Sequence, residues 1–331
     1  MSSASALPAP RSAFADFFDK AGMLVVLAIL FLGCSLFVEN FLSWRNMQGL
    51  ALAVSMTGMV ACTMMFCLAA GDFDLSVGSM VAAAGVIAAV VMNRTGSVAA
   101  GVAAALGFGL ATGLVNGLVV AQLGVNALIT TLASMQVVRG LAFIVSGGSA
   151  VGIAAEPFFA LGSGGLLGVP VPVWITIACF AAAGFTLNRT VFGRDTLAVG
   201  GNPEAARLAG IDVARVKIAV FATQGLMAAL AGVVLASRVT SGQPNTSVGF
   251  ELEVISACVL GGVSLSGGVA RVSHVISGVL ILGIVQNAMN LLNVPTFWQY
   301  VARGLILLAA VLLDRWNHLK GQGVKRLNPA G

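Results

Sequence analysis

Long apolar runs separated by short polar segments make up most of this 331-residue chain. A helix needs about 20 apolar residues to cross a membrane, because each residue adds only ~1.5 Å along its axis. A tenth run, 254–263, is too short to cross alone and is followed by SLSGG. We expect a broken helix there beside a cavity, because irregular backbone within a membrane requires surrounding protein or water. The pattern predicts nine further spans, at residues 21–38, 47–70, 77–92, 97–122, 126–145, 173–187, 218–237, 272–292 and 300–313.

Composition agrees with this pattern, since 58% of the residues are hydrophobic and 9% are charged. Soluble domains are about one quarter charged. We therefore predict an all-α, polytopic integral membrane protein with about ten transmembrane helices, surrounded by lipid. Its expected parts are a cytoplasmic N-terminal tail at 1–20, a transmembrane domain at 21–313 and a cytoplasmic C-terminal tail at 314–331. The basic residues are scattered between the spans, so no nucleic-acid partner is expected.

Two loops on either side of one predicted span differ sharply in charge. Segment 146–172 contains no Lys or Arg, whereas segment 188–217 contains five of the seventeen in the chain. Basic residues collect in cytoplasmic loops, so segment 188–217 is expected in the cytoplasm. An even number of spans then places both termini there too. The five residues are Arg189, Arg194, Arg207, Arg215 and Lys217.

Segment 188–217 also carries the signals of a short helix. Asn202 can accept hydrogen bonds from free amides at a helix start, Pro203 fits the first turn, and Glu204 suits the positive end of the helix dipole. Gly210 is a typical helix stop. A helix this short is marginal by itself, which favours a binding partner. The alternative is a solvated loop whose charges only set the orientation in the membrane.

Uncharged polar residues inside predicted spans indicate a second candidate site. Gln286, Asn287 and Asn290 fall at three- and four-residue intervals and share one helix face. Amides and hydroxyls suit a neutral, polyhydroxylated solute, because such a solute needs donors and acceptors but no counter-ion. The alternative is that the amides join helices to one another. The candidate pathway also includes Asn116, Thr130, Thr131 and Ser134.

The sequence offers little for an enzyme. A phosphate-binding P-loop has Gly immediately before its Lys, and no lysine of this chain follows a glycine. The two histidines are isolated, and the five cysteines lack metal-ligand spacing, so we expect no catalytic residue, metal or cofactor in this chain. The paired acids at 72/74 and 251/253 fall at span ends, which argues against a proton-driven transporter.

Four stretches together resemble the membrane subunits of bacterial ABC importers for monosaccharides, the group of ribose, xylose, galactose and arabinose permeases. The resemblance implies a homodimer of permease chains in the inner membrane, a separate cytoplasmic ATPase that binds ATP and Mg, and a periplasmic sugar-binding protein. The four stretches are GDFDLSVGS (71–79), GLVNGLVVAQLGVNALITTLASMQVVRG (113–140), FGRDTLAVGGNPEAARLAGI (192–211) and GFELEVISACVLGGVSLSGGVA (249–270).

The third stretch matches the core of the coupling loop through which such permeases grip their ATPase. The proline that follows the glycine in other ABC importers is missing after Ile211. The resemblance implies sugar transport by alternating access, and the alternative is a secondary sugar transporter or facilitator that works without an ATPase. The candidates for docking the sugar-binding protein are Arg45, Arg94 and Glu251. The candidate coupling residues are Asn202, Glu204, Ala205, Ala206, Arg207 and Gly210.

Overall fold

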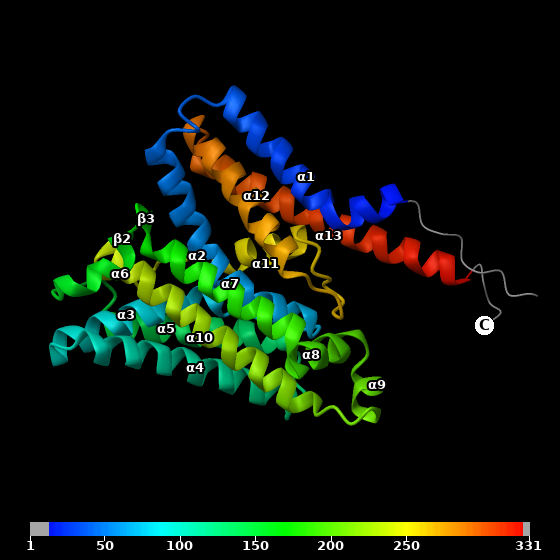
Figure 1. Cartoon of the computed structure of the whole chain (residues 1–331). Coiled ribbons are helices and arrows are strands. Elements are labelled where there is room, and N and C mark those ends of the chain that lie inside the picture. Colours follow the sequence, from blue (N-terminus) through cyan, green and yellow to red (C-terminus); the bar gives the residue numbers. More distant parts are fainter. Residues whose placement is uncertain (1–12, 327–331) are drawn as a thin grey trace, which may run out of the picture.

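The computed structural model of the chain describes residues 13–326, and helices make up nearly all of it (Figure 1). The long helices run lengthwise through the bundle. The short helix α11 lies among them, and α8 and α9 lie at one end of the bundle (Figure 1). The α-helices are α1 (Ala13–Phe37), α2 (Trp44–Ala69), α3 (Val77–Thr95), α4 (Val98–Ala121), α5 (Ala127–Ser146), α6 (Ala160–Ser163), α7 (Val171–Arg189), α8 (Val191–Gly201), α9 (Pro203–Leu208), α10 (Val213–Val239), α11 (Phe250–Leu260), α12 (Val272–Leu291) and α13 (Thr296–Arg326).

The prediction of an all-α, polytopic membrane protein is confirmed. Within the described residues, seven helices are long and apolar enough to span a membrane: α2, α3, α4, α5, α7, α10 and α12. Shorter apolar stretches occupy Gly22–Phe37 of α1 and Thr296–Leu312 of α13. Helix α11 has 11 residues, which agrees with the expected broken helix at 254–263.

The centre of the bundle is built from α2, α3 and α10, whose apolar residues are largely buried. Small residues bring α4 and α10 into close contact. A Cβ atom on Gly109 would collide with the carbonyl of Gly225, and one on Gly225 would collide with the carbonyl of Gly109. Helices without a hydrophobic driving force between them associate through such close backbone packing.

The polar segment between α10 and α11 does not lie outside the bundle. Residues 242–249 run back along α3 into the bundle, because a Cβ on Gly242 would lie 2.5 Å from the carbonyl oxygen of Gly85 and one on Gly78 would lie 2.5 Å from that of Ser247. Arg139 of α5 makes this entry possible. Its Nη1 donates to the carbonyl oxygens of Pro244 and Thr246, both at 2.7 Å, which supplies donors that water would otherwise provide.

Helix α11 therefore begins inside the bundle, level with the middle of α2. Thr57, near the middle of α2, donates to Glu253 in the first turn of α11 at 2.7 Å. The loop after α11 reaches the last residue of α2, where the Gly268 amide donates to the Ala69 carbonyl at 2.8 Å. An extended segment, a half-length helix and a loop together replace one continuous span.

Two short strand pairs organise the opposite end of the bundle. Strand β1 (Val151–Gly152) pairs with β4 (Ser241–Gly242) in antiparallel fashion, with Val151 opposite Gly242. Strand β2 (Gly165–Leu166) pairs with β3 (Val169–Pro170), and the 3₁₀ helix η1 (Glu156–Phe159) precedes α6. Gln48 ties the start of α2 to this end through a 3.3 Å bond to the Gly168 carbonyl.

Both terminal helices extend further than the sequence predicts. Helix α1 starts at Ala13, within the expected N-terminal tail, and α13 continues to Arg326, through most of the expected C-terminal tail. The other parts of those two tails, 1–12 and 327–331, lie outside the described residues. The start of α1 and the end of α13 both lie toward the end of the bundle that carries α8 and α9 (Figure 1).

Candidate functional site

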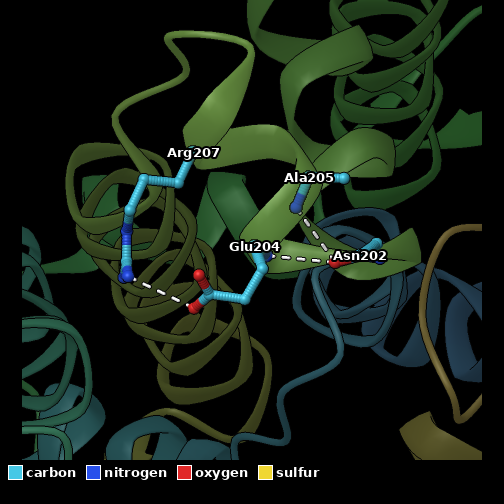
Figure 2. A network of polar contacts seen from close by, with 4 residues as sticks. All are labelled: Asn202, Glu204, Ala205 and Arg207. Atoms are coloured by element: carbon cyan, nitrogen blue, oxygen red, sulfur yellow. Dashed lines mark hydrogen bonds and ion pairs between the residues drawn. The ribbon is translucent and has the colours of Figure 1, made fainter.

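The predicted short helix forms, as α9, and both of its ends are capped. The Asn202 side chain accepts from the backbone amides of Glu204 at 3.1 Å and Ala205 at 3.0 Å (Figure 2). Glu204 also pairs with Arg207 one turn later at 3.2 Å, as Figure 2 shows. At the other end Gly210 has a φ of 87°, and its amide donates to the carbonyl of Arg207. This left-handed residue closes the helix in the arrangement that favours glycine.

Helix α9 projects from the bundle with little packing of its own. Ala206 is buried, and the other residues of the helix are exposed. Leu208 is 89% exposed. Six residues cannot hold a helix by themselves in water. The capped ends and the exposed leucine therefore fit a helix that is received by another protein.

Helix α8 connects α9 to the interior of the bundle. Its residue Gly200 lies against the end of α2 and the loop after α11: a Cβ there would collide with the carbonyl of Ala69 and approach the Gly268 amide to 2.7 Å. A Cβ on Gly267 would in turn lie 2.6 Å from the Gly200 carbonyl oxygen. Backbone contact this close leaves no room for α8 to move without α2 or α11.

A buried polar network holds the segment between α2 and α3. Asp72 pairs with Lys217 near the start of α10, with Nζ 2.9 Å from Oδ2 and 3.1 Å from Oδ1. Asp74 accepts from the amide of Ser76 at 2.9 Å, and the Ser76 hydroxyl accepts from Asn116 of α4 at 3.1 Å. One predicted pathway residue, Asn116, belongs to this network instead of the α12 face. The hydroxyl of another, Thr131, donates to the Ala127 carbonyl of its own helix at 2.8 Å and lies 3.4 Å from the Phe73 carbonyl.

Gln286, Asn287 and Asn290 of α12 line one chamber, as predicted for a shared helix face, but their hydrogen-bond partners differ. Asn287 exchanges two hydrogen bonds with Asn46 of α2, at 2.9 and 2.8 Å, so it joins helices. Asn290 accepts from Gln299 of α13 at 2.9 Å. Among the residues that the structure describes, the Gln286 amide makes no hydrogen bond and faces open space.

That open space is a chamber of about 300 Å³ between α2, α11 and α12. We call it the α12 chamber, and its polar lining consists of Thr57, Arg238, Glu253, Gln286, Asn287 and Asn290. A second cavity of about 150 Å³ adjoins it, shares Glu253 and Gln286, and reaches Arg303 and Tyr300 of α13. Small-molecule sites are typically concave, mostly apolar and equipped with a few convergent polar groups, and the chamber fits that description.

The charged residues Glu253 and Arg303 were not among the pathway residues predicted from the sequence. Glu253 accepts from Thr57 and lies 3.4 Å from the Nη1 of Arg303, which also stacks over Tyr300 at 5.0 Å. The sequence placed the 251/253 acids at the boundary of a span. Their position in the first turn of a helix that begins mid-bundle could not be recognised without knowing how residues 242–249 fold.

The remaining predicted residues are spread over the molecule. Thr130 bonds to the Asn126 carbonyl of its own helix at 3.0 Å, and Ser134 is half-buried on α5. Arg45 and Arg94 are exposed, whereas Glu251 lies inside the bundle against Gly78 of α3. The structure therefore does not bring the three docking candidates together on one surface.

The chain matches known transport proteins over nearly its whole length. Residues 46–311 match the family described as branched-chain amino acid transport system / permease component. The L-arabinose transport system permease protein AraH of Escherichia coli is 61% identical over 95% of this chain and 96% of its own length. The L-arabinose ABC transporter permease protein AraH of Azospirillum brasilense is 53% identical, covering 93% and 91%.

More distant relatives carry a different sugar in their names. The ribose import permease protein RbsC of Bacillus subtilis is 40% identical over 92% of this chain and 95% of its own length. No solved structure matches the chain. The resemblance to monosaccharide ABC permeases, predicted from four stretches of sequence, is confirmed by these matches.

Proposed function

The chain belongs to the family of branched-chain amino acid transport system permease components, and from that membership we propose that it is the membrane-spanning subunit of an ATP-driven importer of L-arabinose. The identity of the sugar rests on the two relatives named for L-arabinose, which are more similar to this chain than the ribose relative is. The chain moves the sugar across the membrane and leaves it chemically unchanged.

Energy for transport comes from a separate cytoplasmic ATPase that binds ATP and Mg. We propose that α9 is the element this ATPase grips. The support is physical: α9 is capped at both ends by Asn202 and Gly210, it is too short to be stable unaided, and it exposes Leu208 to a partner. An apolar side chain presented on a polar helix fits a hydrophobic cleft in the receiving protein.

The packing of α8 offers a route from the ATPase to the transport pathway. A displacement of α9 moves α8, and Gly200 of α8 contacts both the end of α2 and Gly268 in the loop after α11. Helices α2 and α11 form two walls of the α12 chamber. Closure of the ATPase would thus open the chamber to one side of the membrane or the other, which is alternating access.

The membrane arrangement follows from the same assignment. With α9 in the cytoplasm, both terminal helices point to the cytoplasmic side of the bacterial inner membrane (Figure 1). The end with β1–β4 faces the periplasm, where a sugar-binding protein delivers the solute, and exposed Arg45 and Arg94 remain candidates for its docking. A second copy of the permease completes the translocating unit as a homodimer.

The test of α9 uses Glu204→Lys and Gly210→Pro in the full chain. We expect both variants to be produced at normal levels, to lose co-purification with the ATPase and to lose sugar uptake. Glu156→Lys is the matched control, because it reverses an exposed charge at the opposite end of the bundle. Normal ATPase binding by both α9 variants would refute the role of this helix.

A further inference from the structure

The α12 chamber extends from one end of the bundle to its middle. Its upper wall is the first part of α2, which Gln48 anchors to the loop at Gly168, and its floor is formed by Thr57 and Glu253. The residues between are largely apolar, including Leu50, Val279 and Leu282. Polar groups line the chamber at both levels: Arg238, Asn287 and Asn290 lie toward the end that carries β1–β4, and Thr57 and Glu253 lie at the floor.

Two features of Gln286 distinguish this chamber from ordinary helix packing. Gln286 lines both the chamber and the adjoining cavity, and its amide has no partner among the described residues. Arg303 lines the adjoining cavity, where its Nη1 lies 3.4 Å from Glu253. The Gln286 side chain is half-buried and lines both cavities, so its donors and its acceptor are open to a ligand or to water.

We propose that Glu253, Gln286 and Thr57 form the sugar-contacting site of the transport pathway. The proposal rests on the proposed function and specifies where a monosaccharide binds within it. Glu253 accepts two bonds in this structure, and a carboxylate has about four acceptor positions, so sugar hydroxyls can bind to the remaining ones. Gln286 offers two N–H donors and a carbonyl acceptor, which matches hydroxyls that both donate and accept.

The neighbouring amides have a different role. Asn287 uses both its amide nitrogen and its oxygen in bonds to Asn46, so its side chain is committed to a helix contact. The Asn290 oxygen accepts from Gln299, so that oxygen is committed as well. The apolar wall suits the C–H face of a sugar ring, and the polar floor suits its hydroxyls. Charge on Glu253 is balanced by Arg303, and Arg238 adds a second positive charge to the lining, so the site disfavours a cation.

The position of Glu253 on α11 joins binding to the conformational cycle. The loop after α11 contacts α8 through Gly267 and Gly268, and α8 carries α9. A shift of α11 that is driven from α9 would pull Glu253 away from Thr57 and Gln286 and divide the site. A low-affinity site that is dismantled in this way releases its solute to the other side.

The test is protection of a cysteine from chemical labelling. Gln286→Cys and the control Gln122→Cys are made in the full chain with Cys179→Ala, because Cys179 is only half-buried and the other four cysteines are buried. Gln122 lies at the end of α4, far along the sequence from the chamber lining. Both proteins, in detergent, react with a charged maleimide in the presence of increasing L-arabinose.

We expect L-arabinose to slow labelling of Gln286→Cys by the factor 1 + [L]/Kd, about threefold when the sugar is at twice its dissociation constant. Labelling of Gln122→Cys should not change. Adding Glu253→Gln should weaken the protection and raise the sugar concentration needed for it. Ala53→Cys, which lines the chamber but is not a proposed contact, is labelled in parallel because Gln286→Cys removes one contact itself. Labelling that no monosaccharide slows at either position would overturn the site.

The outcomes also separate this site from the proposed substrate. Protection by ribose or another monosaccharide but not by L-arabinose would support the chamber and refute L-arabinose as the sugar. ATP-driven uptake of L-arabinose by the unmodified importer, together with no protection at Gln286→Cys or Ala53→Cys, would support the proposed function and refute the site.

Discussion

The ion pair between Asp72 and Lys217 should stabilise the end of the bundle that carries α8 and α9, and mutation can measure its contribution. The Asp72 side chain is 9% exposed and that of Lys217 is 20% exposed, so the pair is shielded from water and salt. It joins the segment between α2 and α3 to α10, immediately after the segment that carries α9. Lys217→Met removes the cation and leaves a buried carboxylate without its partner.

The expected loss is large because an uncompensated buried charge is worse than no charge. Breaking a buried pair on one side costs about 3–5 kcal/mol of unfolding free energy. Asp72→Asn should cost less, about 1.5 kcal/mol, because Lys217 is more exposed and its long side chain can turn its ammonium toward water. In the double variant Asp72→Asn removes the orphaned charge, so we expect a recovery of about 2 kcal/mol relative to the sum of the single losses.

The dependence on pH provides a second readout. Burial raises the pKa of Asp72 above its ordinary value, although Lys217 acts in the opposite direction. In Lys217→Met the cation that lowers the pKa of Asp72 is gone, so the pKa of Asp72 in the folded state rises further. A raised pKa means that the protonated carboxyl favours the folded state. The deficit of this variant should therefore be greatest above the raised pKa and shrink as the pH falls through it.

The assay is unfolding of the purified protein in mixed detergent micelles, followed at several pH values. Arg215→Met is the matched control: its partner is Asp212 at 2.9 Å, but the two side chains are 87% and 51% exposed. Such exposed pairs contribute less than about 1 kcal/mol. Equal losses for Lys217→Met and Arg215→Met, or a double variant whose loss is the sum of the two single losses, would refute the argument.

Two further predictions concern packing and capping. Gly109→Ala should greatly reduce the yield of folded protein, because its Cβ would collide with the Gly225 carbonyl. Gly107→Ala on the same helix should be tolerated, because a Cβ there has nothing within 4 Å. Equal yields of the two variants in detergent extraction would contradict this packing. Asn202→Ala removes the two cap bonds of α9 and should cost about 1 kcal/mol of local helix stability, weakening ATPase co-purification roughly fivefold while leaving the unfolding of the whole chain unchanged. Unchanged co-purification would mean that α9 does not need to be helical to bind.

The local features of the chain could be predicted from its sequence. Apolar length identified the spans, and the Asn202 cap and Gly210 stop located α9, because these signals depend only on neighbouring residues. The short run at 254–263 likewise indicated a broken helix. Each of these predictions depends only on residues that are close together along the chain.

Contacts between distant residues could not be predicted in this way. The polar composition of residues 242–249 is typical of a solvated loop, and what draws them into the bundle is Arg139, more than 100 residues earlier. The depth of Glu253 follows from that entry. Thr131 and Asn287 appeared equivalent to Gln286 as intramembrane polar groups, yet Thr131 donates to Ala127 of its own helix and Asn287 bonds to Asn46. Only the folded structure separates bonded groups from open ones.

The most direct test of the account is uptake of labelled L-arabinose into proteoliposomes that contain this chain. The account predicts uptake when the sugar-binding protein, the ATPase and ATP with Mg are all supplied, and no uptake when any one of them is omitted. Accumulation against a gradient should stop in the Glu204→Lys variant. Uptake by the permease chain alone, without an ATPase, would contradict the account and identify the protein as a facilitator or secondary transporter.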